Sequence, residues 1–452
     1  MQQCLDQIKK IRNRKNEYGI TLHITYTILR LEQNIDRIKK LLHLLAYDAE
    51  QNGLGKEVHF FKEMVSLECD QTNLRKYLEQ NINLMAFQIT EHASKKGAHY
   101  ISNNRREYWR MLISAAIGGF MVGFLSVFKS VIYYWKISPF GKAFFYSMNY
   151  SFGFMGLYMA GGTLATKQPA MTASTIAQSL GDPGAKGKDI PGQFARLIAR
   201  TSRTQLIAFF GNVALSFPVA FGVSWLIYLL NGEHLATPEK AHHLMHELHP
   251  WHSPALFHAG IAGVYLFLSG LIAGYYDNKI VSEKIPQRVA HHPVLNRIFS
   301  HRFCERLGHY IDNHGGALAG NFYLGIFLGS TGIVGEFLGL PIDIRHITFA
   351  AGNFGIALAG LNNHIPWPEV LVAWLGIVGI GGMNFAVSFS LAIFVATQSL
   401  KINQRLDKKT TNKKLLSYLG WYFIRHPGAF FLPPRKRNED EEIKEKAENM
   451  AF

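Results

Sequence analysis

The chain has 452 residues, a formal net charge of +15 and a mean hydropathy of +0.03. The length would suit two or three soluble domains, but long blocks almost without charge between Met111 and Ala396 exclude an ordinary soluble protein and predict transmembrane helices. The cysteines are too few and too scattered for a disulfide framework or a Cys-x-x-Cys metal site: Cys4, Cys69 and Cys304.

Residues 1–108 are polar and basic, and we expect them to form a cytoplasmic helical bundle or hairpin. The first residues, MQQCLDQIKKIRNRKNEYG, lack the apolar core of a signal peptide, so the first hydrophobic segment is expected to act as an uncleaved insertion signal. Further helices are expected over 57–68 and 72–102. An apolar seam favours packing over the alternative, a basic helix that binds a polyanion. The seam consists of Ile28, Leu31, Ile35, Ile38, Leu42 and Leu45.

Six apolar segments between residues 109 and 397 predict a transmembrane domain. Each has at least 23 residues, which at about 1.5 Å per residue exceeds a hydrocarbon core of about 30 Å. The alternative, buried helices of a large soluble protein, would require repeated charge-free helices of this length. The predicted crossings are residues 111–135, 143–165, 205–230, 254–276, 315–340 and 370–396.

The distribution of Lys and Arg predicts the orientation. Residues 1–110 hold 18, the five connections hold 2, 6, 1, 6 and 1, the tail after Ala396 holds 12, and Lys129 inside the first segment completes the total of 47. Because basic residues gather in cytoplasmic loops, the alternation predicts a multi-pass membrane protein with both termini in the cytoplasm. Topology thus explains the net charge, and the residues alone do not point to nucleic acid as a partner.

Residues 347–361 are apolar but too short to be a seventh crossing. At about 22 Å they cannot span upright, and a crossing here would place the basic tail outside. We expect a re-entrant half-helix, which membrane proteins tolerate only where it is buried in protein or lines a wet cavity. The alternative is a loop on the outer surface with one buried helical turn.

Small residues spaced four apart suggest close helix packing. Such pairs let helix backbones approach in lipid, and they predict a homo-oligomer formed through these faces as one possible use. The pairs are Gly119/Gly123, Gly270/Gly274, Gly325/Gly329 and Gly335/Gly339.

Residues 398–452 are expected to form a basic cytoplasmic tail. Its stretch 415–432, LLSYLGWYFIRHPGAFFL, is aromatic and too short to cross a bilayer. We therefore expect a helix that lies in the membrane interface there.

Ionisable residues follow the fifth segment and mark a candidate polar membrane site. Charges at membrane depth are costly, so such residues favour a functional hypothesis, here a site for an ion, a proton or a small anion. An internal salt bridge that pins the half-helix is the simpler interpretation. The residues are Glu336, Asp343, Arg345, His346 and Asn353.

Thr166, Lys167 and Gln168 close the second segment just before Pro169 and are a candidate cytoplasmic gate or phosphate contact. A plain helix end with an interfacial lysine explains them equally well. The following GDPGAKGKD does not match the phosphate-binding loop G-x-x-x-x-G-K-[ST], so no nucleotide site is predicted.

A histidine-rich stretch between the third and fourth segments is a weak candidate metal site. His242, His246 and His249 share one helical face at i, i+4 and i+7, a spacing at which imidazoles bind Zn²⁺ or Cu²⁺. No cysteine and no His-Glu-x-x-His motif accompany them, so a solvated loop is the favoured interpretation. No other cofactor is expected.

Three stretches, ITEHASKKGAHYI, ATKQPAMTA and GLPIDIRHITFAAGNFGIAL, together with the helical N-terminal region, resemble the bacterial family of site-specific recombinases of the Gcr type. The resemblance extends from Cys4 to about Pro434. It implies polytopic proteins of the bacterial inner membrane and DNA strand exchange, with nucleic acid as a partner. It supplies no active site, and members are usually longer at the N-terminus.

The residues favour a different function from the one that the resemblance implies. A tyrosine recombinase needs a nucleophile among Arg, Lys and His groups, but none of the twenty histidines has Arg three residues later. Residues 1–108 offer no activated serine either. We therefore predict a transporter-like or membrane-assembly role without an enzymatic site, and keep a recombinase or a membrane-tethered recombination factor as the alternative.

Overall fold

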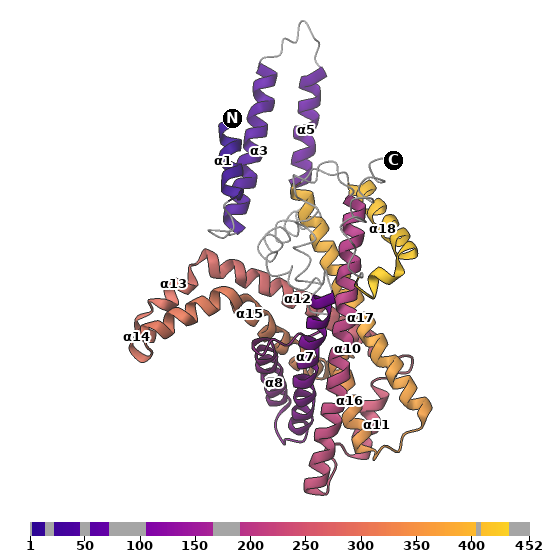
Figure 1. Ribbon diagram of the computed structural model, residues 1–452. Helices are drawn as coiled ribbons and strands as arrows, with labels where there is room; N and C mark the ends of the chain where they lie inside the picture. Colours follow the sequence, from indigo (N-terminus) through magenta and orange to yellow (C-terminus); the bar gives the residue numbers. More distant parts are fainter. Residues whose placement is uncertain are drawn as a thin grey trace. The chain divides into compact units, whose positions relative to one another are not determined.

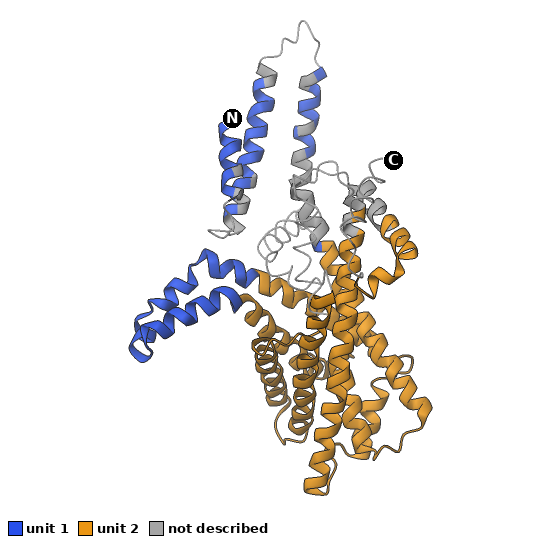
Figure 2. Cartoon of the chain, viewed as in Figure 1, with its two compact units in different colours: residues 1–92, 275–315, 395–406 blue, residues 93–274, 316–394, 407–452 orange. Residues whose placement is uncertain are grey.

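The computed structural model describes residues 2–13, 22–45, 55–71, 105–165, 190–403 and 408–433 (Figure 1). These residues form helices and no strands, as an all-α prediction requires. The chain divides into two compact units, each built from several separate stretches (Figure 2). Unit 1 comprises residues 1–92, 275–315 and 395–406, and unit 2 comprises the rest.

The N-terminal part of unit 1 contains α1 (Gln2–Asn13), α3 (Leu22–Leu45) and α5 (Gly55–Gln71). The predicted seam on α3 is covered only in part. Ile28 and Ile35 are buried together with Ile8 of α1, whereas Leu31 and Ile38 are each 47% exposed and Leu42 is 50% exposed. The helix expected over 72–102 lies outside the described residues, and the proposed domain boundary at 108 stays a prediction.

Unit 1 also contains an arm, defined here as residues 275–315. It comprises the end of α12 (Ala255–Ser282), α13 (Ile285–Ala290), α14 (Pro293–Ile298) and the start of α15 (His301–Leu338). A proline lies in the first turn of both short helices, where the N–H that it lacks would have no intrahelical partner. The two long helices approach closely, because a methyl group at Gly315 would overlap Ile280.

Unit 2 holds most of the long apolar helices. Five helices are long and apolar enough to cross a membrane, and they correspond to five of the six predicted segments. The remaining segment, residues 143–165, corresponds to α8 (Pro139–Met159), a 21-residue helix outside that set, so six crossings stay a prediction. The five are α7 (Arg105–Tyr133), α10 (Ile190–Asn231), α12, α15 and α17 (Trp367–Asn403).

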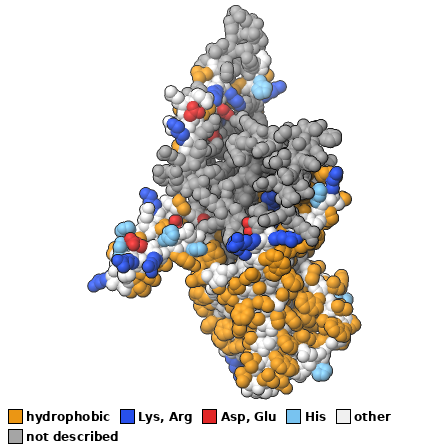
Figure 3. Space-filling view, in the orientation of Figure 1, with side chains coloured by type: hydrophobic (Ala, Val, Ile, Leu, Met, Phe, Trp, Pro, Cys, Tyr) orange, Lys and Arg blue, Asp and Glu red, His pale blue; other side chains and the backbone are white. Residues whose placement is uncertain are grey.

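Large apolar side chains remain exposed on these helices. Phe120 of α7, Phe210 of α10 and Val378 of α17 are 47%, 65% and 66% exposed. Figure 3 shows hydrophobic side chains over the visible face of this part of the chain. Such extended apolar surface is typical of helices that face lipid.

Glycines bring the helices of unit 2 into close contact. A methyl group at Gly119 would overlap the backbone of Asn212 on α10, and one at Gly123 would overlap Val219 on the same helix. Gly325 and Gly329 similarly meet the backbone of α8 at Ser151 and Ser147. Two of the predicted glycine pairs therefore serve packing within the chain. The homo-oligomer stays a prediction.

The predicted half-helix is α16 (Ile347–Gly360), and it is buried in unit 2. It contacts α7, α10 and the short helix α11 (Pro238–His246). Phe354 and Ile356 are at most 1% exposed. Its 14 residues measure about 21 Å, too short to cross a bilayer upright.

The helix expected over 415–432 is divided in two. Helix α18 (Lys408–Arg425) ends before Pro427, and a single 3₁₀ turn, η3 (Pro427–Phe430), follows. Both lie against α10, and the Tyr108 hydroxyl donates a hydrogen bond to the Phe431 carbonyl at 3.4 Å. Proline interrupts the helix because it lacks the N–H that a continuing helix needs.

Candidate functional site

An extended connection, residues 339–346, brings the chain back along α15 before α16 begins. Gly339 ends α15 in the left-handed region at φ 64, where a residue with a side chain would be strained. The connection then passes two glycines of α15: Gly335 faces the Ile342 carbonyl, and Gly332 faces the Asp343 carboxylate. A side chain at either glycine would block this path.

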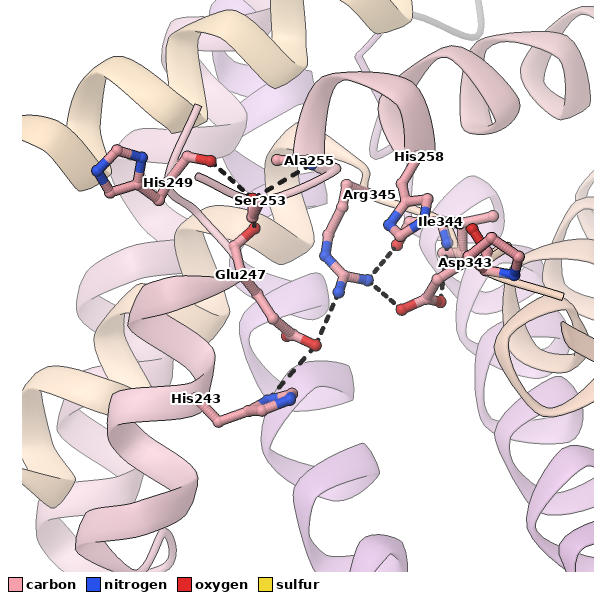
Figure 4. Close-up of polar contacts among 10 residues, drawn as sticks. His243, Glu247, His249, Ser253, Ala255, His258, Asp343, Ile344 and Arg345 are labelled. Atoms are coloured by element: carbon pink, nitrogen blue, oxygen red, sulfur yellow. Dashed lines mark hydrogen bonds and ion pairs between the residues drawn. The ribbon is translucent and has the colours of Figure 1, made fainter. Parts of the chain in front are cut away.

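Arg345 joins two carboxylates from different parts of the chain (Figure 4). One terminal nitrogen lies 2.7 Å from Glu247 Oε1, just after α11, and the other pairs with Asp343 in the connection. The same nitrogen that pairs with Asp343 also donates to the Ile344 carbonyl at 2.8 Å. Arg345 is buried, with its side chain 13% exposed, so it ties the α11 turn to the connection before α16.

Three cations and two carboxylates gather in this region. The Lys129 ammonium of α7 lies 5.4 and 5.6 Å from the ring centres of Tyr146 and Tyr150 on α8. The Lys240 ammonium of α11 lies 4.1 Å from the Tyr133 ring. With Arg345, Asp343 and Glu247 these groups form a set that we call the charged cluster; three positive and two negative charges leave a net charge of +1.

Asp343 lies in the connection, outside the spanning helices, and its carboxylate is held ionised. Burial disfavours the charge, but Arg345 and Lys129 attract it and the Ile344 N–H donates to it at 2.8 Å, so the pKa of Asp343 lies below its usual value. The pKa of Lys240 is lowered by burial, with Glu247 acting in the opposite direction. The cluster therefore contains a carboxylate that remains charged into acid.

Asn384 of α17 fixes the backbone at the start of α16. Its side-chain nitrogen donates to the carbonyls of Ala259 and Arg345 at 2.8 and 2.9 Å, and its oxygen accepts from the Ile347 N–H at 3.1 Å. Asn384 is fully buried. One side-chain amide thus links α12 and α17 to residues 339–346 and positions the Arg345 backbone.

Asn212 of α10 forms a second polar junction. Its nitrogen donates to the carbonyls of Ala115 and Thr163 at 2.7 and 2.9 Å. Its oxygen accepts from the Ala165 N–H and the Thr348 hydroxyl, both at 2.9 Å. Because both donors and both lone pairs are used, Asn212 is a structural junction between α7, α16 and the chain after α8.

His346 caps α16 and is neutral. Its Nδ1 accepts from the Thr348 N–H, and its Nε2 contacts the Ala165 carbonyl, both at 3.3 Å. A backbone N–H can only donate and a carbonyl can only accept, so the proton is on Nε2. The His346 ring therefore holds α16 in place as an N-cap.

The structure brings together only part of the predicted polar membrane site. Asp343 and Arg345 form an ion pair, and His346 follows as the cap. Glu336 is exposed and stands outside the ion pairs of the cluster, and Asn353 lies partly buried within α16. The candidate gate, Thr166, Lys167 and Gln168, lies outside the described residues. Function at all of these positions stays a prediction.

The histidines of the weak metal site lie on and just after α11. Within the part of the chain that the structure describes, no three metal-ligand side chains lie together in a way that could hold an ion. His249 uses Nδ1 to accept the N–H groups of Trp251 and His252 at 3.2 and 3.1 Å. Binding of Zn²⁺ or Cu²⁺ by His242, His246 and His249 stays a prediction.

Several residues of the charged cluster and of the two asparagine junctions were not among the sequence candidates. Lys129, Asn212 and Asn384 each interrupt an apolar segment, which is the signal that marks costly polar groups in membrane helices. In the sequence analysis Lys129 enters only the count of basic residues. Glu247 lies in the histidine-rich stretch and carries no comparable signal, because acidic residues are common in loops.

A family model described as site-specific recombinase matches residues 1–433. The chain belongs to the site-specific recombinase family. No curated protein and no solved structure matches it. The family resemblance drawn from the three sequence stretches is thus confirmed.

Proposed function

We propose that this family member is a multi-pass membrane protein with a transporter-like role, and that its charged cluster forms a site for a small anion. The observation that carries the proposal is the Arg345–Asp343–Glu247 group, placed beside a short buried helix. Charges in such surroundings are costly and mark substrate or ion pathways in membrane proteins.

The arrangement of residues 339–360 supports a re-entrant element. An extended limb runs back along α15, and α16 is buried against three other helices. Non-helical backbone at membrane depth is tolerated where protein surrounds it, and broken helices of this kind line the substrate sites of many transporters. The proposal therefore treats residues 347–361 as entering and leaving on one side.

The charge of the cluster supports an anionic substrate. Arg345 Nε is buried and has no hydrogen-bond partner, while the cluster carries a net positive charge. A small anion such as phosphate or a carboxylate would balance that charge and compete with Asp343 and Glu247 for Arg345. Arg345 would then release Asp343 and Glu247 when it binds the anion and pair with them again when the anion leaves.

Anion flux into proteoliposomes tests the proposal. Phosphate, acetate and chloride serve as probes, and flux of at least one should exceed that of protein-free vesicles. Arg345→Ala should lower it about tenfold or more, because the variant lacks the guanidinium that would bind the anion, and one charge-assisted hydrogen bond is worth roughly 1.5–3 kcal/mol. Arg425→Ala, on the exposed end of α18, is the matched control. Equal flux in wild-type and protein-free vesicles for all three probes would refute the anion site.

Topology reporters test the re-entrant element separately. Reporters fused after Leu340 and after Asn363 should be active on one side of the membrane, and a C-terminal reporter on the other. If the reporters after Leu340 and after Asn363 were active on opposite sides of the membrane, the stretch between them would be a seventh crossing. The anion site would then lose its structural basis.

A second candidate function is a membrane-tethered factor in DNA recombination. The family model, which spans 433 residues, favours it. The charged cluster does not suit strand exchange, because Arg345 is 13% exposed and a DNA duplex cannot reach it. Duplex binding by the full-length protein, weakening steeply between 50 and 200 mM salt, would support this function. Salt-independent or absent binding would count against it.

A further inference from the structure

The arm (residues 275–315) carries excess positive charge at its tip. Of its four acidic residues, Glu283 lies 3.9 Å from Lys279 and 3.8 Å from Arg288, and Glu305 lies 3.4 Å from His301. Arg297 and Arg302 stand outside these ion pairs and are exposed. The basic charge that remains available to a partner is therefore concentrated around α14 and the start of α15.

The same tip exposes large apolar side chains. Val294 and Ile298 of α14 are 57% and 66% exposed, and Phe299 and Phe303 are each 46% exposed, with their rings 4.9 Å apart. Helix α14 buries none of its residues. Figure 3 shows hydrophobic side chains among basic and histidine side chains on this arm. An apolar tip ringed by basic groups is the pattern of a surface that enters a membrane interface.

Helix continuity keeps the base of the arm close to a bilayer. Helix α12 is continuous from Ala255 to Ser282, and its apolar stretch ends near Tyr276. Only six residues, about 9 Å of helix, separate Tyr276 from Ser282. Helix α15 likewise continues from the arm into an apolar segment. Continuous helix therefore joins both ends of the arm to segments that are apolar enough to cross a membrane.

From these observations we infer that the tip of the arm docks on an anionic phospholipid surface. Ile298, Phe299 and Phe303 enter the acyl boundary, and Arg297 and Arg302 contact lipid phosphates. Duplex DNA would satisfy the arginines but would leave the apolar side chains exposed, so lipid fits both halves of the tip. The inference does not depend on the anion site.

A fluorescent label at the tip tests the inference on the full-length protein. NBD is attached to Phe299→Cys after Cys4 and Cys69 are replaced by serine; Cys304 is buried and stays. The protein is placed in nanodiscs of phosphatidylcholine with or without phosphatidylglycerol. Lipids brominated on the acyl chains should quench this label at least about threefold more than a label at Glu305→Cys, an exposed position about half a helical turn from Phe303 on α15.

Charge reversal identifies the role of the arginines. In discs with phosphatidylglycerol, Arg297→Glu with Arg302→Glu should reduce the quenching at position 299 to the level at position 305. A monodisperse gel-filtration peak confirms that each variant is folded. Equal quenching at positions 299 and 305 would overturn the inference. So would quenching at position 299 that changes neither when phosphatidylglycerol is added nor when the arginines are reversed in charge. A duplex oligonucleotide that changes the emission at position 299 in discs without phosphatidylglycerol would identify a nucleic-acid surface instead.

Discussion

Asp343 makes the stability of the cluster depend on pH. Its pKa is lower in the folded chain than in the unfolded chain, so the folded state binds fewer protons and gains stability from the charge. That gain is complete above the unfolded value of about 4 and is lost as the pH falls through the folded pKa. The ion pair between Asp343 and Arg345 is therefore lost as the pH falls through the folded pKa of Asp343.

We expect Asp343→Asn to flatten this acid dependence. The wild-type melting temperature in detergent should fall between pH 5 and pH 3 by more than that of the variant, because the variant has no carboxylate to protonate. Melting curves at several pH values provide the measurement. Parallel curves for the two proteins would show that Asp343 contributes no pH-dependent stability.

Asn384 should matter for stability although it carries no charge. Asn384→Leu removes three buried hydrogen bonds and leaves the Ile347 N–H and the Arg345 carbonyl without their asparagine partner, at about 1–3 kcal/mol for each unsatisfied group. We expect a melting temperature several degrees lower than that of the wild type. Asn313→Ala, an exposed position with local hydrogen bonds, should change it little. Similar melting temperatures for both variants would contradict the role assigned to Asn384.

At the scale of elements, glycine contacts set how closely helices approach. The α8–α15 pair depends on Gly325, where a methyl group would overlap the Ser151 backbone. A methyl group at Gly222 of α10 would have no neighbouring atom within 4 Å. The two glycines therefore offer a matched pair in which the same substitution has different surroundings.

Gly325→Ala should destabilise the protein by about 1–3 kcal/mol, because backbone atoms cannot rotate away from an added methyl group. Gly222→Ala should be neutral or slightly stabilising, since alanine favours a helix more than glycine does. Denaturation in mixed detergent measures both. Equal effects would show that the α8–α15 contact tolerates a wider spacing.

The ends of two predicted helices can be compared with the ends found in the structure. The short apolar helix was predicted at 347–361 and is found at Ile347–Gly360, because a capping histidine precedes it and two asparagines in the left-handed region follow it. The helix expected at 415–432 is instead split before Pro427. Apolar periodicity identified the segment, while the proline decided where the helix ends.

At the scale of the whole molecule, five helices are long and apolar enough to cross a membrane, and large apolar side chains are exposed on them. We expect the protein to stay in the membrane pellet after a carbonate wash and to be released by detergent. Fractionation with an antibody against an added tag measures this. Release by carbonate would mean that the apolar faces are covered by protein rather than by lipid.

The amino-acid order by itself determined the helical class, the five long apolar helices, the short helix and membership of the family, because runs of apolar residues and their lengths are local properties of a chain. The charged cluster was decided by tertiary structure. Glu247 is 98 residues from Arg345 in sequence, and Lys129 is farther still, so no local pattern pairs them. Only the return of the chain along Gly332 and Gly335 brings those charges together, since a helix that bears side chains there would keep them apart.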